Sequence, residues 1–209
     1  MSKKSIDINQ RIPLDTLYAA LEAYLNDSYS NDYILEQLKL EYKGENRLKK
    51  ALRIVNKIII KSPIRSFLDS NKEVLNSAIK KKTDRNIILI ALLNAAFPFS
   101  FDVLCVFGKY FSVQEIINAE TIKKSISSVY GGNRATENGI YSVVPMFLEA
   151  GFFDRPKQGI YQWQNKISPN SEITEKLFSE SFKVNNGLSE IHDYQLMDPY
   201  FQFVEILNL

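Results

Sequence analysis

Apolar residues recur three and four positions apart along most of the chain, which is the spacing of amphipathic helices. This pattern predicts helices in the first part of the chain over residues 14–26, 34–42, 45–61, 64–70, 72–81, 84–96 and 100–110. Residues 84–96 are apolar on nearly every side, so we expect this helix to be central and fully buried. Residues 1–12 precede the first helical pattern and are expected to form a flexible or loosely docked arm.

Capping residues and helix breakers set the expected boundaries of these helices. Gly44 is expected to close the second helix, and Thr83 is a good N-cap for the central one. The sequence SVQE matches a capping box, so a short helix is expected over residues 113–118. A domain boundary, if the chain has one, is expected within residues 111–118.

Residues 119–163 follow the order helix, tight turn, helix and two-stranded ribbon. The first helix, AETIKKSISSVY, ends at Gly131, where glycine permits the positive φ angle of a sharp reversal. Either Asn133 or Thr136 can cap the second helix, whose apolar pattern ends in LEAGFF. Pro145 within this second helix removes a backbone donor, so the helix is expected to begin late or to bend.

The ribbon FFDRPKQGIYQW contains turn residues at its centre. We expect Phe152 and Phe153 in its first strand, residues 154–159 at its tip and residues 160–163 in its return strand. Aromatic residues at such positions are more often part of a core than stacking platforms for bases. We therefore expect Tyr161 and Trp163 of the ribbon to be core residues.

The N-terminal part of the second helix carries the candidate reading residues. In helix-turn-helix proteins this part of the second helix faces base edges in the major groove. Arginine suits guanine and asparagine suits adenine, so Arg134 and Asn138 are the first candidates, and Thr136 is expected on the same exposed face. The same hypothesis assigns further nucleic-acid contacts, to phosphates or a minor groove, to Lys123, Lys124, Arg155, Lys157 and Gln158.

Charge is unevenly distributed, although the formal net charge is only +2. Residues 39–85 carry 14 Lys or Arg against 5 Asp or Glu, whereas residues 1–38 carry 3 against 6 and residues 167–209 carry 2 against 7. A basic middle between acidic ends matters for polyanion binding, but lysines also simply solvate exposed helix faces.

The predicted helix over residues 45–61 is the most basic one. Spacings of three and four place Lys49, Lys50, Arg53 and Lys57 close to one face. Neighbouring like charges cost a few tenths of a kcal/mol, roughly, so this face is expected either to meet phosphates or to be merely solvated. The lysines at 80–82 are better explained by the favourable position of cations at a helix C-terminus.

The C-terminal part of the chain is acidic and predicts helices over residues 171–183 and 200–207. Asp198 is a good N-cap for the last helix. We expect that helix to dock on the bundle; left exposed, it would be a partner-binding helix.

No catalytic constellation is visible in the sequence. The single histidine and the single cysteine, Cys105, rule out a Cys/His metal cluster, and no glycine-rich phosphate loop precedes a helix. One cysteine also excludes an intramolecular disulfide and fits a reducing cytoplasm. The longest apolar run, residues 87–101, is too short and interrupted to span a bilayer. We therefore expect a cytoplasmic protein without enzymatic activity, cofactor or membrane association.

Two resemblances add to these expectations. Residues 119–163 resemble the winged helix-turn-helix superfamily, whose topology serves DNA binding, RNA binding and protein–protein contact. The order of a basic GENRLKKALRIVNK segment, a central ALLNAAF segment and a closing NRATENGIYSVVPMFLEAGFF segment is similar to the small helical BrxA-type proteins of BREX phage-defence systems. That second resemblance implies DNA binding in a prokaryotic defence locus.

Together these observations predict a mainly α protein. An N-terminal helical bundle with a basic helix would occupy residues 1–111. A winged-helix-like domain with a short β-hairpin and acidic C-terminal helices would occupy residues 112–209. The leading hypothesis is binding of double-stranded DNA, and the alternative is a protein–protein adaptor that uses the winged helix as a scaffold and the acidic tail as a contact.

Overall fold

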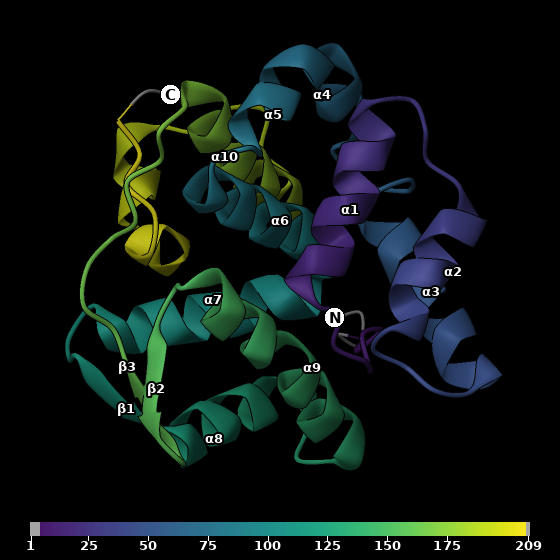
Figure 1. Ribbon diagram of the computed structural model, residues 1–209. Helices are drawn as coiled ribbons and strands as arrows, with labels where there is room; N and C mark the ends of the chain where they lie inside the picture. The colour runs from purple at the N-terminus through teal and green to yellow at the C-terminus, as the bar shows by residue number, and fades with distance from the viewer. Residues whose placement is uncertain (1–4, 208–209) are drawn as a thin grey trace.

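The computed structural model describes residues 5–207 and is mainly helical, which confirms the predicted class (Figure 1). Its α-helices are α1 (Leu14–Leu25), α2 (Asn31–Lys39), α3 (Glu45–Ile58), α4 (Arg65–Ser70), α5 (Lys72–Ala78), α6 (Lys82–Ala96), α7 (Pro98–Phe111), α8 (Ala119–Tyr130), α9 (Arg134–Ala150) and α10 (Glu172–Asn186). Three short strands, β1 (Ile116–Asn118), β2 (Asp154–Lys157) and β3 (Ile160–Gln162), form one small sheet.

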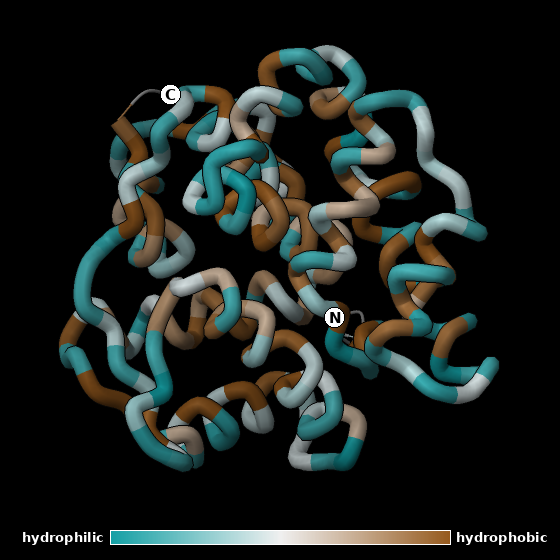
Figure 2. Tube along the Cα trace, viewed as in Figure 1, coloured by the Kyte–Doolittle hydropathy of each residue, from teal (hydrophilic) through white to brown (hydrophobic). Residues whose placement is uncertain are grey.

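Helix α6 lies at the centre of the molecule, as its apolar sequence predicts. Its residues from Asn86 to Ala96 are all buried, and α1, α3, α7, α9 and α10 pack around it. Figure 2 shows the hydrophobic segments gathered there, with hydrophilic segments toward the outside. The buried side chains of the N-terminal and C-terminal halves belong to one hydrophobic cluster. The division into domains 1–111 and 112–209 therefore stays a prediction.

The N-terminal arm is anchored, which corrects the expectation of a loose segment. Ile8 and Ile12 are fully buried, although residues 5–13 form no helix. The guanidinium of Arg11 lies 2.7 Å from the carboxylate of Glu149 in α9, and the backbone N–H of Leu14 donates to the same carboxylate at 3.0 Å. Contacts with distant residues, invisible to local sequence patterns, hold the arm in place. Residues 1–4 of the predicted arm lie outside the described residues.

The expected short helix over residues 113–118 is wrong, because residues 116–118 form strand β1. The backbone N–H of Trp163 donates to the carbonyl of Glu115 at 3.0 Å, and Ile117 pairs with Tyr161 across the sheet. This pairing also buries Ile117 almost completely. A distant strand thus supplies hydrogen bonds that outweigh the local capping-box signal.

The ribbon is an antiparallel hairpin, but its strands are shifted from the prediction. β2 spans Asp154–Lys157, so the expected tip residues form the first strand and the turn falls at Gln158 and Gly159. Phe152 and Phe153 precede the strand and are buried. Sheet order is β1-β3-β2, with both strand pairs antiparallel.

Helix α9 begins at Arg134, directly after the turn, and continues through Pro145, so the expected delayed start is wrong and the expected bend stays a prediction. The side-chain oxygen of Asn133 accepts from the backbone N–H groups of Ala135 at 2.9 Å and Thr136 at 3.2 Å, which caps the helix directly after the turn. Burial of Val143, Val144 and Phe147 holds the segment around the proline against the core. Tertiary packing therefore compensates for the missing backbone donor.

Two other capping predictions are wrong. Gly44 does not close α2, which ends at Lys39; it is the N-cap of α3 instead. Thr83 lies inside α6, whose N-cap is Lys81. The neighbouring Asp84 is fully buried, and its carboxylate accepts from the backbone N–H of Asn170 at 2.9 Å, a contact with the distant tail.

The acidic tail docks on the bundle, as the preferred reading predicts. α10 packs along α6, and Tyr200, Phe201 and Phe203 are buried. The predicted helix over residues 200–207 is wrong, however. Asp198 caps only a short 3-10 helix, Pro199–Gln202, after which Val204 bridges to Ile167 in extended conformation.

Within residues 5–207, no single helix combines the length and apolar composition needed to cross a membrane. α6 and α7 together would meet both criteria, but they meet at a bend of 120°.

Candidate nucleic-acid interface

The turn between α8 and α9 holds the two helices in a fixed relation. Gly131 has a φ of 88°, which reverses the chain after α8. The hydroxyl of Thr136 donates to the carbonyl of Gly131 at 2.6 Å, and Thr136 is fully buried. The expectation that Thr136 shares the exposed face of α9 is therefore wrong, because its short side chain closes the turn.

The exposed face of α9 consists of Arg134, Asn138 and Tyr141. These residues are separated by four and three positions, so they share one side of the helix. The aromatic side chain of Tyr141 is 70% exposed, which is unusual for so large a ring. The opposite side of α9 packs into the core through Ile140, Val143 and Phe147. A rigid helix thus presents a cation, an amide and an aromatic ring to the outside.

An ion pair ties α8 to α9 beside this face. The ammonium of Lys123 lies 2.7 Å from the carboxylate of Glu137, and this hydrogen bond raises the pKa of Lys123. Lys123 is therefore not a free cation, whereas Lys124, the next residue, is exposed. The pair neutralises the acidic residue nearest to Arg134 and Asn138.

The hairpin offers a second group of polar side chains. Arg155, Lys157 and Gln158 are exposed, as predicted. The guanidinium carbon of Arg155 lies 6.0 Å from the ring centroid of Tyr161, within the range of a weak cation–π contact.

Aromatic packing fixes the base of the hairpin. The ring of Phe153 stacks on Phe107 of α7 at 4.3 Å between centroids, and Tyr161 meets Phe107 edge-on at 5.1 Å. Trp163 is half-buried and lies 6.4 Å from Phe111. Tyr161 is therefore a core residue, as predicted, and Trp163 packs against the core as a half-buried side chain.

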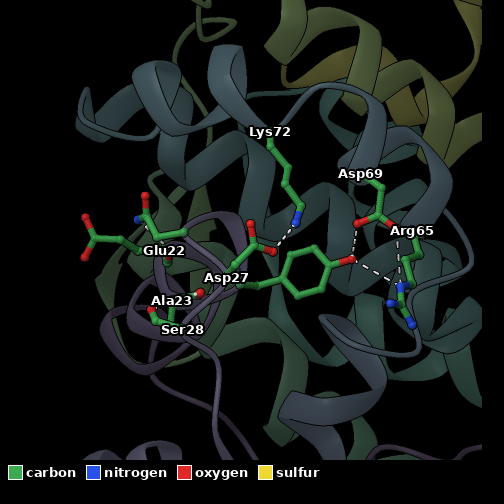
Figure 3. A network of polar contacts seen from close by, with 9 residues as sticks. Glu22, Ala23, Asp27, Ser28, Arg65, Asp69 and Lys72 are labelled. Atoms are coloured by element: carbon green, nitrogen blue, oxygen red, sulfur yellow. Dashed lines mark hydrogen bonds and ion pairs between the residues drawn. The ribbon is translucent and has the colours of Figure 1, made fainter.

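Several of the cations between residues 39 and 85 pair with groups of the protein itself. Figure 3 shows part of this pairing where α4 and α5 meet the end of α1. The phenol of Tyr24 donates to the carboxylate of Asp69 and accepts from the guanidinium of Arg65 at 3.1 Å. The ammonium of Lys72 pairs with Asp27 and lies 5.5 Å from the ring centroid of Tyr24.

The same pairing continues along α1. The ammonium of Lys80 lies 2.6 Å from the carboxylate of Glu22, and this hydrogen bond lowers the pKa of Glu22 and raises that of Lys80. The guanidinium of Arg85 sits 4.3 Å from the ring centroid of Tyr18. Carboxylates of the acidic start thus pair with some cations of the basic middle at the α1 surface. The ion pair with Glu22 accounts for Lys80, so its position near a helix C-terminus is not needed to explain it.

Helix α3 keeps free cations on part of its outer face. Among its four predicted contact residues, Lys49 pairs with Glu45 at 2.5 Å. Lys57 pairs with Asp7 and lies 4.3 Å from the ring centroid of Phe97. Lys50 and Arg53 are exposed, and the residues described here include no acidic partner for either. Arg47, one turn earlier and also exposed, belongs with them, although it is not among the predicted contact residues.

The predicted contact residues therefore fall on two surfaces. One combines α8, the start of α9 and the hairpin; the other is the outer face of α3. Figure 1 shows α3 on the side of the molecule opposite the hairpin. Among residues 5–207 no group of three His, Cys, Asp or Glu side chains could hold a metal ion.

Comparison of the chain with protein-family models, with curated proteins and with solved structures gives no match. The winged-helix and BrxA-type resemblances therefore stay predictions.

Proposed function

We propose that this protein is a non-catalytic DNA-binding protein that inserts the N-terminal half of α9 into the major groove of a duplex. The observation that carries the proposal is the exposed row of Arg134, Asn138 and Tyr141 on the second of two consecutive, tightly connected helices. The element order α7-β1-α8-α9-β2-β3 with sheet order β1-β3-β2 supports it, because a winged helix has this arrangement and uses its second motif helix for reading.

Each exposed group suits a particular contact. The guanidinium of Arg134 can donate two hydrogen bonds to a guanine edge, and the amide of Asn138 can both donate to and accept from adenine. Arg155, Lys157 and Gln158 on the hairpin would contact phosphates or the neighbouring minor groove, and Lys124 a phosphate. Thr136 has no direct contact in this scheme because it is buried.

The resemblance to BrxA-type proteins supports a place in a prokaryotic phage-defence system, and the single cysteine supports a cytoplasmic location. Both belong to the proposal.

A mobility-shift titration with duplex DNA, single-stranded DNA and RNA tests the function. We expect the wild-type protein to bind duplex DNA with an affinity that falls steeply with salt. The double variant Arg134→Ala/Asn138→Ala should lose about 10-fold or more of its affinity for a preferred sequence, since a good bidentate base contact contributes about 1–3 kcal/mol.

Lys176→Ala provides the matched control, because it removes an exposed cation from α10, away from α9 and the hairpin. Its duplex affinity should equal that of the wild type. Wild-type affinity in the α9 double variant would refute the proposal.

The adaptor alternative has one specific observation in its favour. Tyr194 and Met197 are 70% and 88% exposed and lie in the acidic segment that also contains Asp193. Exposed apolar side chains with acidic neighbours suit a protein partner with a basic, apolar surface. Absence of duplex, single-strand and RNA binding in the same titration would favour this alternative.

A further inference from the structure

The outer face of α3 carries cations that the protein does not neutralise. Elsewhere between residues 39 and 85, most of the cations that lie against neighbouring helices face a carboxylate or an aromatic ring, as Lys72, Lys80 and Arg85 do. Arg47, Lys50 and Arg53 are exposed and have no acidic partner among residues 5–207. The fold thus pairs some of its cations internally and leaves others exposed; three of the exposed ones share α3, whereas Lys43, Lys61, Lys81 and Lys82 lie outside it.

The spacing of these three side chains, and the buried helix face beneath them, suit binding to successive phosphates. Successive positions three apart place them along one side of α3, over about 9 Å at 1.5 Å per residue. That length spans roughly three nucleotides, since a strand of B-form DNA advances about 3.4 Å per phosphate. The inner side of α3 is fixed by the buried residues Ala51, Ile54, Val55 and Ile58, so the row is held on a rigid element.

Position separates this row from the hairpin. Figure 1 shows α3 and the hairpin on opposite sides of the molecule, and the N-terminal arm lies against α3 through the pairing of Lys57 with Asp7. A contact made by α3 would therefore fall outside the segment of duplex covered by the hairpin.

From these observations we infer that α3 forms a second, sequence-independent binding surface for the phosphodiester backbone, through Arg47, Lys50 and Arg53. The inference rests on the proposed function, because it adds a second contact to a protein that reads DNA with α9. The backbone comes either from a flanking part of the same duplex or from a second duplex, and the chemistry of contact is the same.

The test uses the full-length variant Arg47→Gln/Lys50→Gln/Arg53→Gln, in which glutamine preserves helix propensity. A charge-matched control, Lys109→Gln/Lys166→Gln/Lys176→Gln, removes three other exposed cations. Circular dichroism verifies that both variants fold. If the α3 variant does not fold, the single variants Lys50→Gln and Arg53→Gln take its place, each with about a third of the effect.

On a duplex of about three helical turns, roughly 30 base pairs, three lost phosphate contacts should reduce the slope of log affinity against log salt by about 2.7. Between about 50 and 200 mM salt, the wild-type protein should then lose about 40-fold more affinity than the variant. The control should keep the wild-type slope. An unchanged slope in the α3 variant excludes a flanking contact on the same duplex, whereas an unchanged affinity in Arg134→Ala/Asn138→Ala would overturn the proposed function.

Two further measurements identify the source of the backbone. A duplex of about one turn, roughly 10 base pairs, is too short for a flanking contact. On it the α3 variant and the wild type should therefore show the same slope of log affinity against log salt. Energy transfer between donor-labelled and acceptor-labelled short duplexes reports bridging of two duplexes instead. Either result supports the second surface, and equal behaviour of variant and wild type in all three assays excludes it.

Discussion

The ring of Phe99 occupies the space where a side chain at Gly139 would lie. A Cβ atom built on Gly139 would come within 2.6 Å of Cε1 of Phe99, and within 2.9 Å of a methyl carbon of Ile6. In the sequence this glycine looks like a weakness in α9. In the structure it lets α9 approach α7 and the N-terminal arm closely, and so positions the exposed row that begins at Arg134.

Gly139→Ala is therefore expected to destabilise the protein despite the better helix propensity of alanine. Overpacking against the fully buried Phe99 costs about 1–3 kcal/mol, whereas the gain in propensity is about 1 kcal/mol at most. Thermal unfolding followed by circular dichroism should show a lower melting temperature. Gly132→Ala is the control, since the nearest atom to its added Cβ would be 3.9 Å away. A melting temperature in Gly139→Ala at or above that of the wild type would show that the ring moves aside freely.

Gly108→Ala should detach the C-terminal segment from α7. The added Cβ would lie 1.9 Å from the carbonyl oxygen of Pro199, and a backbone atom cannot move aside as a flexible side chain can. Steric exclusion of this kind costs about 1–3 kcal/mol, occasionally more. Limited proteolysis should cut the variant between residues 188 and 200 faster than the wild type. Equal cleavage rates would contradict the close approach of α7 and Pro199.

The pair formed by Lys123 and Glu137 should have opposite effects when each partner is neutralised. Glu137→Gln removes the negative charge beside Arg134 and releases Lys123, so duplex affinity should rise several-fold and depend more steeply on salt, by up to about 0.9 in the logarithmic slope. Lys123→Gln leaves the carboxylate uncompensated and should weaken binding. Titrations at two salt concentrations measure both effects, and changes of the same sign in the two variants would contradict an electrostatic role for the pair.

Alkaline pH should unfold the protein through its buried tyrosines. Burial raises the pKa of Tyr29 from 10.0 to about 12. Burial also raises the pKa values of Tyr130 and Tyr200, and for Tyr130 the carboxylate of Asp102 adds to the effect. The folded protein thus keeps these protons at a pH where the unfolded chain has lost them. The stabilisation is complete below about pH 10 and disappears as pH rises toward 12 and beyond.

Denaturant titrations at a series of pH values should therefore show an unfolding free energy that declines above pH 10. The tyrosinate absorbance and the loss of helical circular dichroism should rise together, because these phenols ionise only on unfolding. Ionisation of all tyrosines with an intact helical spectrum would contradict the raised pKa values.

Much of the local structure of this protein follows from its sequence alone. Asn133 caps α9 because its side-chain oxygen accepts hydrogen bonds from backbone N–H groups of the first turn. Gly151 ends the helix in the left-handed conformation, which glycine adopts readily because it has no side chain. The burial of α6 follows from a helix that is apolar on every side. These features depend on residues within one or two turns of each other, so a linear pattern contains the information.

Tertiary structure alone decided the features that depend on distant partners. β1 is a strand because β3, roughly forty residues further along the chain, supplies its hydrogen bonds. The N-terminal arm is fixed because Arg11 forms an ion pair with Glu149. The acidic start and basic middle were visible as charge runs, but only the fold showed that Glu22 and Asp27 neutralise lysines of α5 and the segment after it, and that α3 keeps its free cations. Such contacts join groups far apart in the chain, and a sequence pattern contains the groups without the distances between them.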